Sequence, residues 1–160
     1  MKKIGFWKVD TPYGEFSNWW LCGFIYKEHY FISSEQALMW EKAEIFNDKK
    51  VAAQILKTTN QKEIKKLGRQ VENYNEAIWS AQRESVMVDI LMAKFSQNKD
   101  LKEILLETGD AELYEASPLD RIWGIGSADV ENIRGQNLLG KALMKTRAIL
   151  LDQDKQEKDN

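Results

Sequence analysis

The sequence predicts one helix-dominated α+β domain with a small antiparallel sheet supplied mainly by its N-terminal third. Strand-like alternation of apolar and polar residues is concentrated before residue 33. From there to about residue 151, helix formers and apolar residues three or four positions apart prevail. A chain of 160 residues can bury one hydrophobic core, and no repeat or linker divides it. We therefore expect one domain over residues 1–151 and a polar, solvated or frayed tail over residues 152–160.

Three segments are predicted to be strands. Residues 4–9, IGFWKV, alternate in hydrophobicity. Residues 22–32, CGFIYKEHYFI, alternate again, and we interpret them as a hairpin with its bend near Lys27 and Glu28. Residues 111–116, AELYEA, come much later in the chain and are expected to form a strand that leads into a loop.

Helices are predicted for most of the remaining chain. The first begins at Ser33, which as N-cap forms a capping box with Gln36 three residues later. Asp100 is expected to cap a short helix that ends at Gly109. The other predicted helices cover residues 48–57, 60–67, 75–97 and 136–151. In the longest of them, the expected buried stripe consists of Ile78, Ala81, Val88, Leu91, Met92 and Phe95.

The composition argues against several classes of protein. The 23 basic and 25 acidic side chains give a formal charge of −2, the wrong sign for nonspecific binding of nucleic acid. One histidine, His29, and one cysteine, Cys22, do not supply the ligands of a structural zinc site, and no metal or cofactor is expected. The lone cysteine and the lack of any apolar run of about 18 residues predict a cytoplasmic protein without a membrane span. Any catalysis then depends on carboxylates, lysines and hydroxyl groups.

The segment SPLDRIWGIG, residues 117–126, is the first candidate for a functional site. One interpretation is an ordinary loop in which Asp120 is a local cap and Trp123 closes the edge of the core. The other is a carboxylate beside an aromatic wall, with Gly124 letting the backbone approach a flat, polar ligand. Taken alone, the segment favours the first interpretation.

Charged residues elsewhere offer further candidates. Glu35 falls in the first turn of its predicted helix, where the macrodipole favours an ionised carboxylate suited to a general base, although acids are common there without any such role. Lys42 lies seven residues later, on roughly the same helix face. Arg69 is the cation that we would choose to bind a phosphate. Lys8 follows two aromatic residues and is either an exposed strand residue or, if desolvated, a nucleophilic amine.

The tract FSNWW, residues 16–20, places hydrogen-bonding side chains among aromatic rings. Asn18 and Trp19 in this tract suit the stacking and hydrogen bonding of a heterocycle. The same residues equally suit a well-packed turn in which Asn18 supplies a local cap.

Taken in order, these tracts resemble the YbiA-like, or NADAR, family. The matching tracts are YGEFSNW (13–19), SSEQALMWEKA (33–43), LGR (67–69), Trp79, VM (86–87), LMAKF (91–95), LLETG (105–109), Asp120 before WGIG, and GQNLLGKALMKTR (135–147). Any one tract is weak, but the ordered series over about residues 6–150 is specific. Two differences stand out. The family usually has His-Tyr where this chain has Gln36 and Ala37, and often an acid where it has Ile125.

The resemblance implies an enzyme, a hydrolase that cleaves the ribosyl C–N bond of a phosphorylated ribosylamino heterocycle, of the type found among riboflavin-pathway intermediates. It implies catalytic roles for Glu35, Trp79 and Asp120, and Lys8 matches a lysine in part of the family that could capture an opened ribose. The expected substrate-binding residues are Asn18, Trp19, Lys42, Arg69, Trp123, Gly124 and Asn137.

Three other functions stay open at this point. Another branch of the family removes ADP-ribose from guanine, and only that activity would make nucleic acid a partner. A module that binds ADP-ribose or a nucleotide without catalysis is the second alternative. The third is an α-rich, structural or partner-binding protein whose aromatic residues fill the core, with Asp120, Trp79 and Trp123 far apart or buried.

Overall fold

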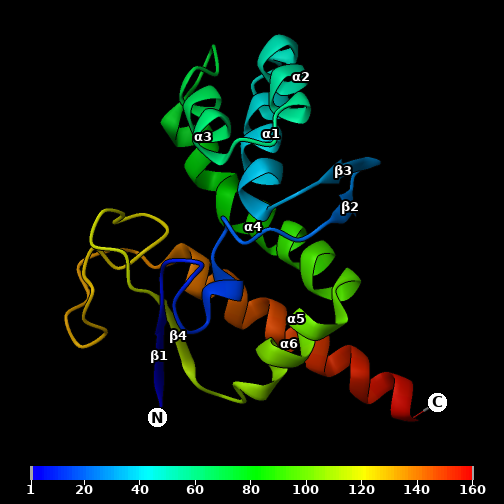
Figure 1. Ribbon diagram of the computed structural model, residues 1–160, viewed down its shortest axis with the longest axis vertical. Coiled ribbons are helices and arrows are strands. Elements are labelled where there is room, and N and C mark those ends of the chain that lie inside the picture. The colour runs from blue at the N-terminus through cyan, green and yellow to red at the C-terminus, as the bar shows by residue number, and fades with distance from the viewer. Residues whose placement is uncertain (1, 160) are drawn as a thin grey trace.

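The structure, a computed structural model that describes residues 2–159, places the predicted hairpin beside the helices (Figure 1). β2 (Phe24–Tyr26) and β3 (His29–Phe31) pair in antiparallel fashion. Lys27 and Glu28 form the bend and both have positive φ, as a tight two-residue hairpin turn requires. The hairpin and its bend are therefore confirmed.

A second pair of strands joins the two ends of the domain. β1 (Lys3–Phe6) lies parallel to β4 (Glu112–Glu115), from which most of the chain separates it. A parallel pair needs a long crossover, which here contains the hairpin and five helices. The helix-dominated α+β class is confirmed, with its strands divided between an antiparallel hairpin and this parallel pair. Because β1 ends at Phe6, Lys8 lies in the turn that follows and not in the strand.

The first four α-helices begin at residues whose side chains cap them. Ser33 accepts a hydrogen bond from the Gln36 N–H (3.1 Å), which confirms the predicted N-cap, and Asp48, Asn60 and Asn75 cap the next three helices in the same way. The helices are α1 (Ser34–Ile45), α2 (Lys49–Lys57), α3 (Gln61–Arg69), α4 (Glu76–Gln97), α5 (Lys99–Glu107) and α6 (Leu138–Asp159).

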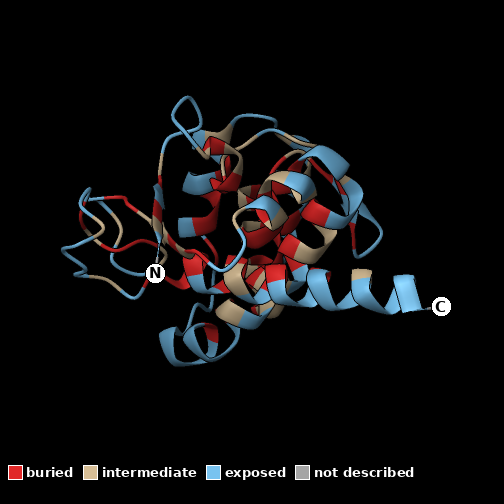
Figure 2. Cartoon of the chain, turned by 90° about the horizontal axis from the view of Figure 1, so that it is seen from below, coloured by how far each residue is buried: buried red, intermediate tan, exposed pale blue. Residues whose placement is uncertain are grey.

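Two helices differ from the prediction. α5 begins directly after Asn98, so Asp100 lies in its first turn and is not the cap. α6 continues through the polar tail to Asp159, where we expected a frayed end after residue 151. Helix-forming Gln, Lys and Glu residues support this extension, and the Lys102 Nζ donates to Asp154 Oδ1 (2.8 Å) and ties it to α5. The tail is nevertheless solvated, as its pale blue turns in Figure 2 show.

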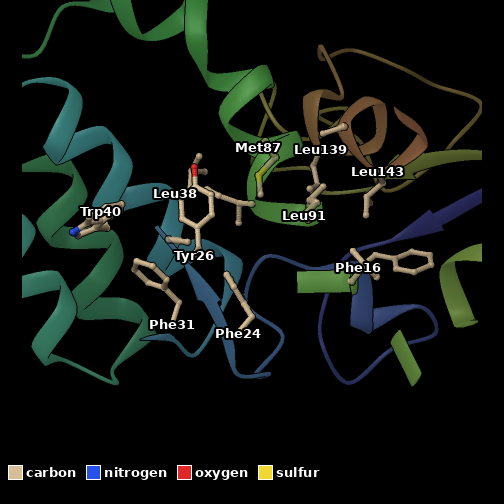
Figure 3. Close-up of a cluster of buried hydrophobic side chains, with 14 of the residues drawn as sticks. Phe16, Phe24, Tyr26, Phe31, Leu38, Trp40, Met87, Leu91, Leu139 and Leu143 are labelled. Atoms are coloured by element: carbon tan, nitrogen blue, oxygen red, sulfur yellow. The ribbon is translucent and has the colours of Figure 1, made fainter. Parts of the chain in front are cut away.

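One hydrophobic core connects the hairpin, α1, α4 and α6 (Figure 3). Side chains from each of these elements meet there, among them Phe31, Leu38, Leu91 and Leu143. The core fixes α1 against α4, and the candidate site lies at the start of α1. None of the helices within the described part of the chain has the length and low charge needed to cross a bilayer.

The buried stripe of α4 is rotated from the predicted one. Ile78 is 47% exposed, whereas the buried residues are Trp79, Arg83, Met87, Ile90, Leu91, Lys94 and Phe95. Hydrophobicity alone could not indicate this face, because it contains an arginine and a lysine. Lys94 is fully buried, and its Nζ donates to the backbone oxygens of Glu15 (2.9 Å) and Ser17 (3.2 Å).

Candidate functional site

The first turn of α1 is held in place by Asn18. The Glu35 N–H donates to the backbone oxygen of Asn18 (2.9 Å), and the Ser34 hydroxyl donates to its Oδ1 (2.8 Å). The Asn18 Nδ2 in turn lies 3.6 Å from the Met87 sulfur on α4. Asn18 is buried, so its side chain fixes where Glu35 emerges from the helix.

Glu35 is half-buried and differs from the expectation of a fully ionised carboxylate. Burial is the main cause that raises its pKa, to about 7, and this outweighs the helix macrodipole. The charge of Lys65 lowers the pKa and the charge of Asp120 raises it, with smaller lowering effects from Lys42 and Arg69. Glu35 is therefore partly protonated at neutral pH, and four charged residues lie within its electrostatic reach: one on its own helix, two on α3 and one in the loop after β4.

Asp120 is both a local cap and a neighbour of Glu35. Its Oδ1 accepts hydrogen bonds from the backbone N–H groups of Ile122 (2.8 Å) and Trp123 (2.9 Å). Within residues 2–159, no hydrogen bond engages the other oxygen of this carboxylate. The structure thus shows the local cap: one oxygen orders the loop, and the other accepts no hydrogen bond from the described residues.

The loop between β4 and α6, yellow to orange in Figure 1, is rigid around Asp120. The Gly126 N–H donates to the Asp120 backbone oxygen (3.0 Å), and the Asn137 N–H donates to that of Gly124 (3.0 Å). A Cβ at Gly124 would lie 2.9 Å from the backbone oxygens of both Asp120 and Glu115. Gly124 is thus required by the close approach of its own loop to β4.

Asn137 joins this loop to β4. Its Nδ2 donates to the Leu113 backbone oxygen (2.9 Å) and its Oδ1 accepts from the Glu115 N–H (3.0 Å). Its φ of 55° is in the left-handed region, which asparagine tolerates better than most residues. Both ends of the amide of Asn137, a predicted substrate-binding residue, are thus engaged by the backbone of β4.

Replacing Asn137 with alanine should therefore destabilise the fold. We expect Asn137→Ala to lower the free energy of unfolding by about 2–4 kcal/mol, because two buried backbone groups lose their partners and a left-handed residue becomes strained. Urea denaturation followed by circular dichroism measures this. Asn132→Ala, at an exposed position of the same loop, is the control. If Asn137→Ala lowers the free energy of unfolding by less than about 1 kcal/mol, Asn137 does not hold the loop to β4 as described.

Cationic side chains also act on Glu35. Lys42 is half-buried, its Nζ donates to the Gly68 backbone oxygen (2.7 Å), and it lies 4.7 Å from the centre of the Tyr74 ring. Burial lowers the Lys42 pKa, and the charge of Glu35 raises it. Arg69, at the end of α3, is exposed. These positions suit a substrate with a phosphate group.

The predicted aromatic site residues and Lys8 differ in how far they are buried. Trp79 is buried in the core on α4, whereas Trp123 and Trp19 are half-buried. The backbone oxygen of Trp19 accepts from Gln61 Nε2 (3.1 Å). Lys8 is exposed with its Nζ 4.9 Å from the Trp7 ring centre. The structure thus brings Glu35, Lys42, Arg69 and Asp120 within electrostatic reach of one another, and within residues 2–159 none of them forms a hydrogen bond or ion pair with Lys8.

Two charged residues of this site were not predicted. Glu115 is the last residue of β4, and nothing in the alternating tract AELYEA indicates a functional role for it. Lys65 is one of several basic residues shortly before Arg69, and nothing in the sequence but its spacing from Arg69 distinguishes it from its neighbours. Its position four residues before Arg69, on the same face of α3, is the one available signal.

The two differences from the family pattern lie in buried positions. The Gln36 Oε1 accepts from the Ile32 N–H (2.9 Å), and its Nε2 donates to the Ile55 backbone oxygen (2.9 Å). Gln36 thus fastens the hairpin and α2 to α1, and Ile125 is fully buried. Among the described residues, no group of three His, Cys, Asp or Glu side chains is arranged to hold a metal ion.

Comparisons with known proteins agree with this arrangement. The model of the NADAR domain matches residues 5–151. An N-glycosidase of Acanthamoeba polyphaga mimivirus is 42% identical over 73% of this chain and 73% of its own. A riboflavin biosynthesis protein of Vibrio vulnificus is 31% identical over 92% of this chain and 38% of its own length. The solution structure of the E. coli protein YbiA superposes with a TM-score of 0.83 at 29% identity, covering 96% of this chain and 87% of YbiA.

These matches identify both the class of enzyme and the family to which the chain belongs. The class is that of hydrolases acting on N-glycosyl compounds, as predicted. The chain belongs to the NADAR family.

Proposed function

We propose that the protein hydrolyses the ribosyl C–N bond of a phosphorylated ribosylamino heterocycle, of the riboflavin-intermediate type. The observation that carries the proposal is the pairing of Glu35 and Asp120, which come from distant segments and interact electrostatically. One of these groups is partly protonated near neutral pH and the other offers an unengaged carboxylate oxygen. Such a pair suits cleavage of a glycosidic bond.

In the proposed reaction, Asp120 faces the anomeric carbon. As the bond from that carbon to nitrogen breaks, positive charge develops on the ribosyl ring, and the Asp120 carboxylate stabilises it. Glu35 donates its proton to the departing nitrogen. A water molecule oriented by Asp120 then adds hydroxide to the anomeric carbon, and its remaining proton restores Glu35. The products are the free amino heterocycle and ribose phosphate.

The surrounding residues would bind the two ends of such a substrate. Lys42 and Arg69 supply positive charge near Glu35 for the phosphate. The half-buried Trp123, held beside Asp120 by its backbone N–H, is proposed as a wall for the heterocycle, with Trp79 and Trp19 as further candidates. Asn18 and Asn137 would act by positioning Glu35 and β4.

The experiment that tests this function offers the protein two kinds of substrate. Ribosylaminopyrimidine phosphates and ADP-ribosylated guanine are each incubated with the protein, and free base is followed by chromatography. The name of the Vibrio vulnificus relative supports the first kind. We expect release of the heterocycle from the first kind and a much slower reaction with the second. Release from neither would contradict the proposal.

Removal of ADP-ribose from guanine is the second candidate. Lys65 joins Lys42 and Arg69 beside Glu35, and three cations are more than a single phosphate requires. A diphosphate would use all of them, and the partner would then be nucleic acid or a guanine nucleotide. A binding module without catalysis has less support, because Gln36, which differs from the family, holds the fold together and leaves Glu35 in place. Calorimetry with ADP-ribose beside the hydrolysis assay separates binding from turnover.

A separate test asks whether Lys8 acts as a covalent nucleophile. Its exposed amine on Trp7 lacks the desolvation that activates a lysine nucleophile. We expect Lys8→Ala to retain turnover of a ribosylaminopyrimidine phosphate within about threefold. Borohydride added during turnover should trap no adduct with that substrate. A trapped adduct that disappears in Lys8→Ala would instead assign Lys8 as a Schiff-base nucleophile.

A further inference from the structure

Glu115 carries a carboxyl group whose main chain is fixed on both sides. Its N–H donates to Asn137 Oδ1 (3.0 Å), and its backbone oxygen accepts from the Ile125 N–H (2.9 Å). The next residue, Ala116, donates its N–H to the Phe6 backbone oxygen (2.7 Å). The end of β4 therefore has little freedom, and the Glu115 side chain emerges at one place beneath the loop that contains Asp120.

One oxygen of this carboxyl is buried without a partner. Glu115 Oε2 is shut off from solvent and accepts no hydrogen bond within the described residues. It is packed so tightly under the loop that a Cβ on Gly124 would lie 3.2 Å from it. A carboxylate charge on such an oxygen would be very costly, whereas a neutral carboxyl tolerates the position much better. The packing alone therefore favours the protonated form.

The two carboxylates that face Glu115 act in the same direction as the packing. Burial is the largest cause that raises its pKa, to about 8, and the charges of Asp120 in the loop and Glu35 on α1 raise it further. The ammonium of Lys65 on α3 opposes them. Two carboxylates and one cation thus act on it, and at neutral pH the proton stays on Glu115.

We propose that Glu115 is a positioning residue of the site, whose neutral carboxyl lets Asp120 carry the negative charge of this cluster. The proposal rests on the proposed function, because it concerns the charge that Asp120 presents to the reacting carbon. If Glu115 lost its proton, two neighbouring carboxylates would be charged and each would favour protonation of the other. A charge on the buried Glu115 Oε2 would also have to be hydrated, so the loop above it would open and Asp120 would lose its fixed position. Glu115 therefore limits the activity on the alkaline side.

A direct test follows the proton on Glu115 by carbon-13 NMR. The carboxyl resonance of Glu115 in the whole chain is assigned through the backbone and titrated. We expect a midpoint near pH 8, against about 4.3 for an ordinary glutamate. Asp120→Asn, which removes a neighbouring charge, should lower that midpoint. Glu112→Gln, on the same strand, is the control and should leave it unchanged. A midpoint below about pH 6 in the wild-type protein would overturn the proposal.

A second test compares pH profiles of kcat/KM for the wild-type protein and Glu115→Gln. Glutamine stays neutral at every pH, so one pH unit above the Glu115 midpoint the wild type should lose about tenfold more of its activity than the variant. Equal relative losses in the two proteins would contradict the proposal. If the wild type cleaves no N-riboside, the proposed function fails while the NMR titration still decides the state of Glu115. If Glu115→Gln does not fold, the midpoint shift in Asp120→Asn remains a test.

Discussion

Asp120→Asn should lower kcat/KM by at least about a thousandfold while leaving the fold intact. An asparagine keeps a side-chain oxygen that can accept from the Ile122 and Trp123 N–H groups, so the loop should retain its conformation. What it loses is the negative charge that would stabilise a ribosyl cation and orient water. The release of free heterocycle measures the change, and circular dichroism checks the fold.

The same loop contains a matched control for this substitution. Asp129 also caps its own turn, with Oδ1 accepting from the Glu131 N–H (2.9 Å), but it is exposed. Asp129→Asn should keep turnover near the wild-type value, since it changes a capping aspartate that we do not place at the reacting carbon. Retention of full turnover by a folded Asp120→Asn protein would refute the mechanism proposed for Asp120.

Local features of the chain could be predicted well because their causes are local. The start of α1 follows from Ser33, whose hydroxyl caps the helix whatever the rest of the fold does. The bend at Lys27 and Glu28 follows from two alternating segments of equal length. The cap formed by Asp120 was predicted correctly, but only the three-dimensional arrangement shows that the same carboxylate also acts electrostatically on Glu35.

The remaining features depend on contacts between distant parts of the chain. The pairing of β1 with β4 brings Glu115 to the site, and nothing within the tract AELYEA indicates that pairing. Lys65 becomes important only because α3 packs beside α1. The protonation of Glu35 was misjudged for the same reason. Its helix position is local and favours the ionised form, whereas the burial that overrides it comes from other elements.

Glu35→Gln is the second substitution for which a large effect is expected. Because glutamine cannot give a proton to the departing nitrogen, kcat/KM should fall roughly a hundredfold to a thousandfold. The loss should be much smaller for a substrate whose leaving group needs no protonation, which distinguishes an acid from a merely structural residue. Glu63→Gln, at an exposed first-turn acid of α3, is the control and should be neutral.

The pH dependence of kcat/KM for the wild-type protein should also show the titration of Glu35. The proton-donating form of Glu35 is lost as the pH rises through about 7, so kcat/KM should decline there, and Glu35→Gln should lack this step. The pH dependence of folding stability gives an independent measure of the protonation of Glu35. A folded pKa above the ordinary value means that the folded state binds the proton more tightly, so this contribution is complete below about pH 4.5 and is lost as the pH approaches 7. Thermal unfolding between pH 5 and 8 should therefore show a smaller loss of stability in Glu35→Gln than in the wild type. A variant that unfolds with the wild-type pH dependence would mean that Glu35 is ionised throughout this range, which would contradict its role as the proton donor.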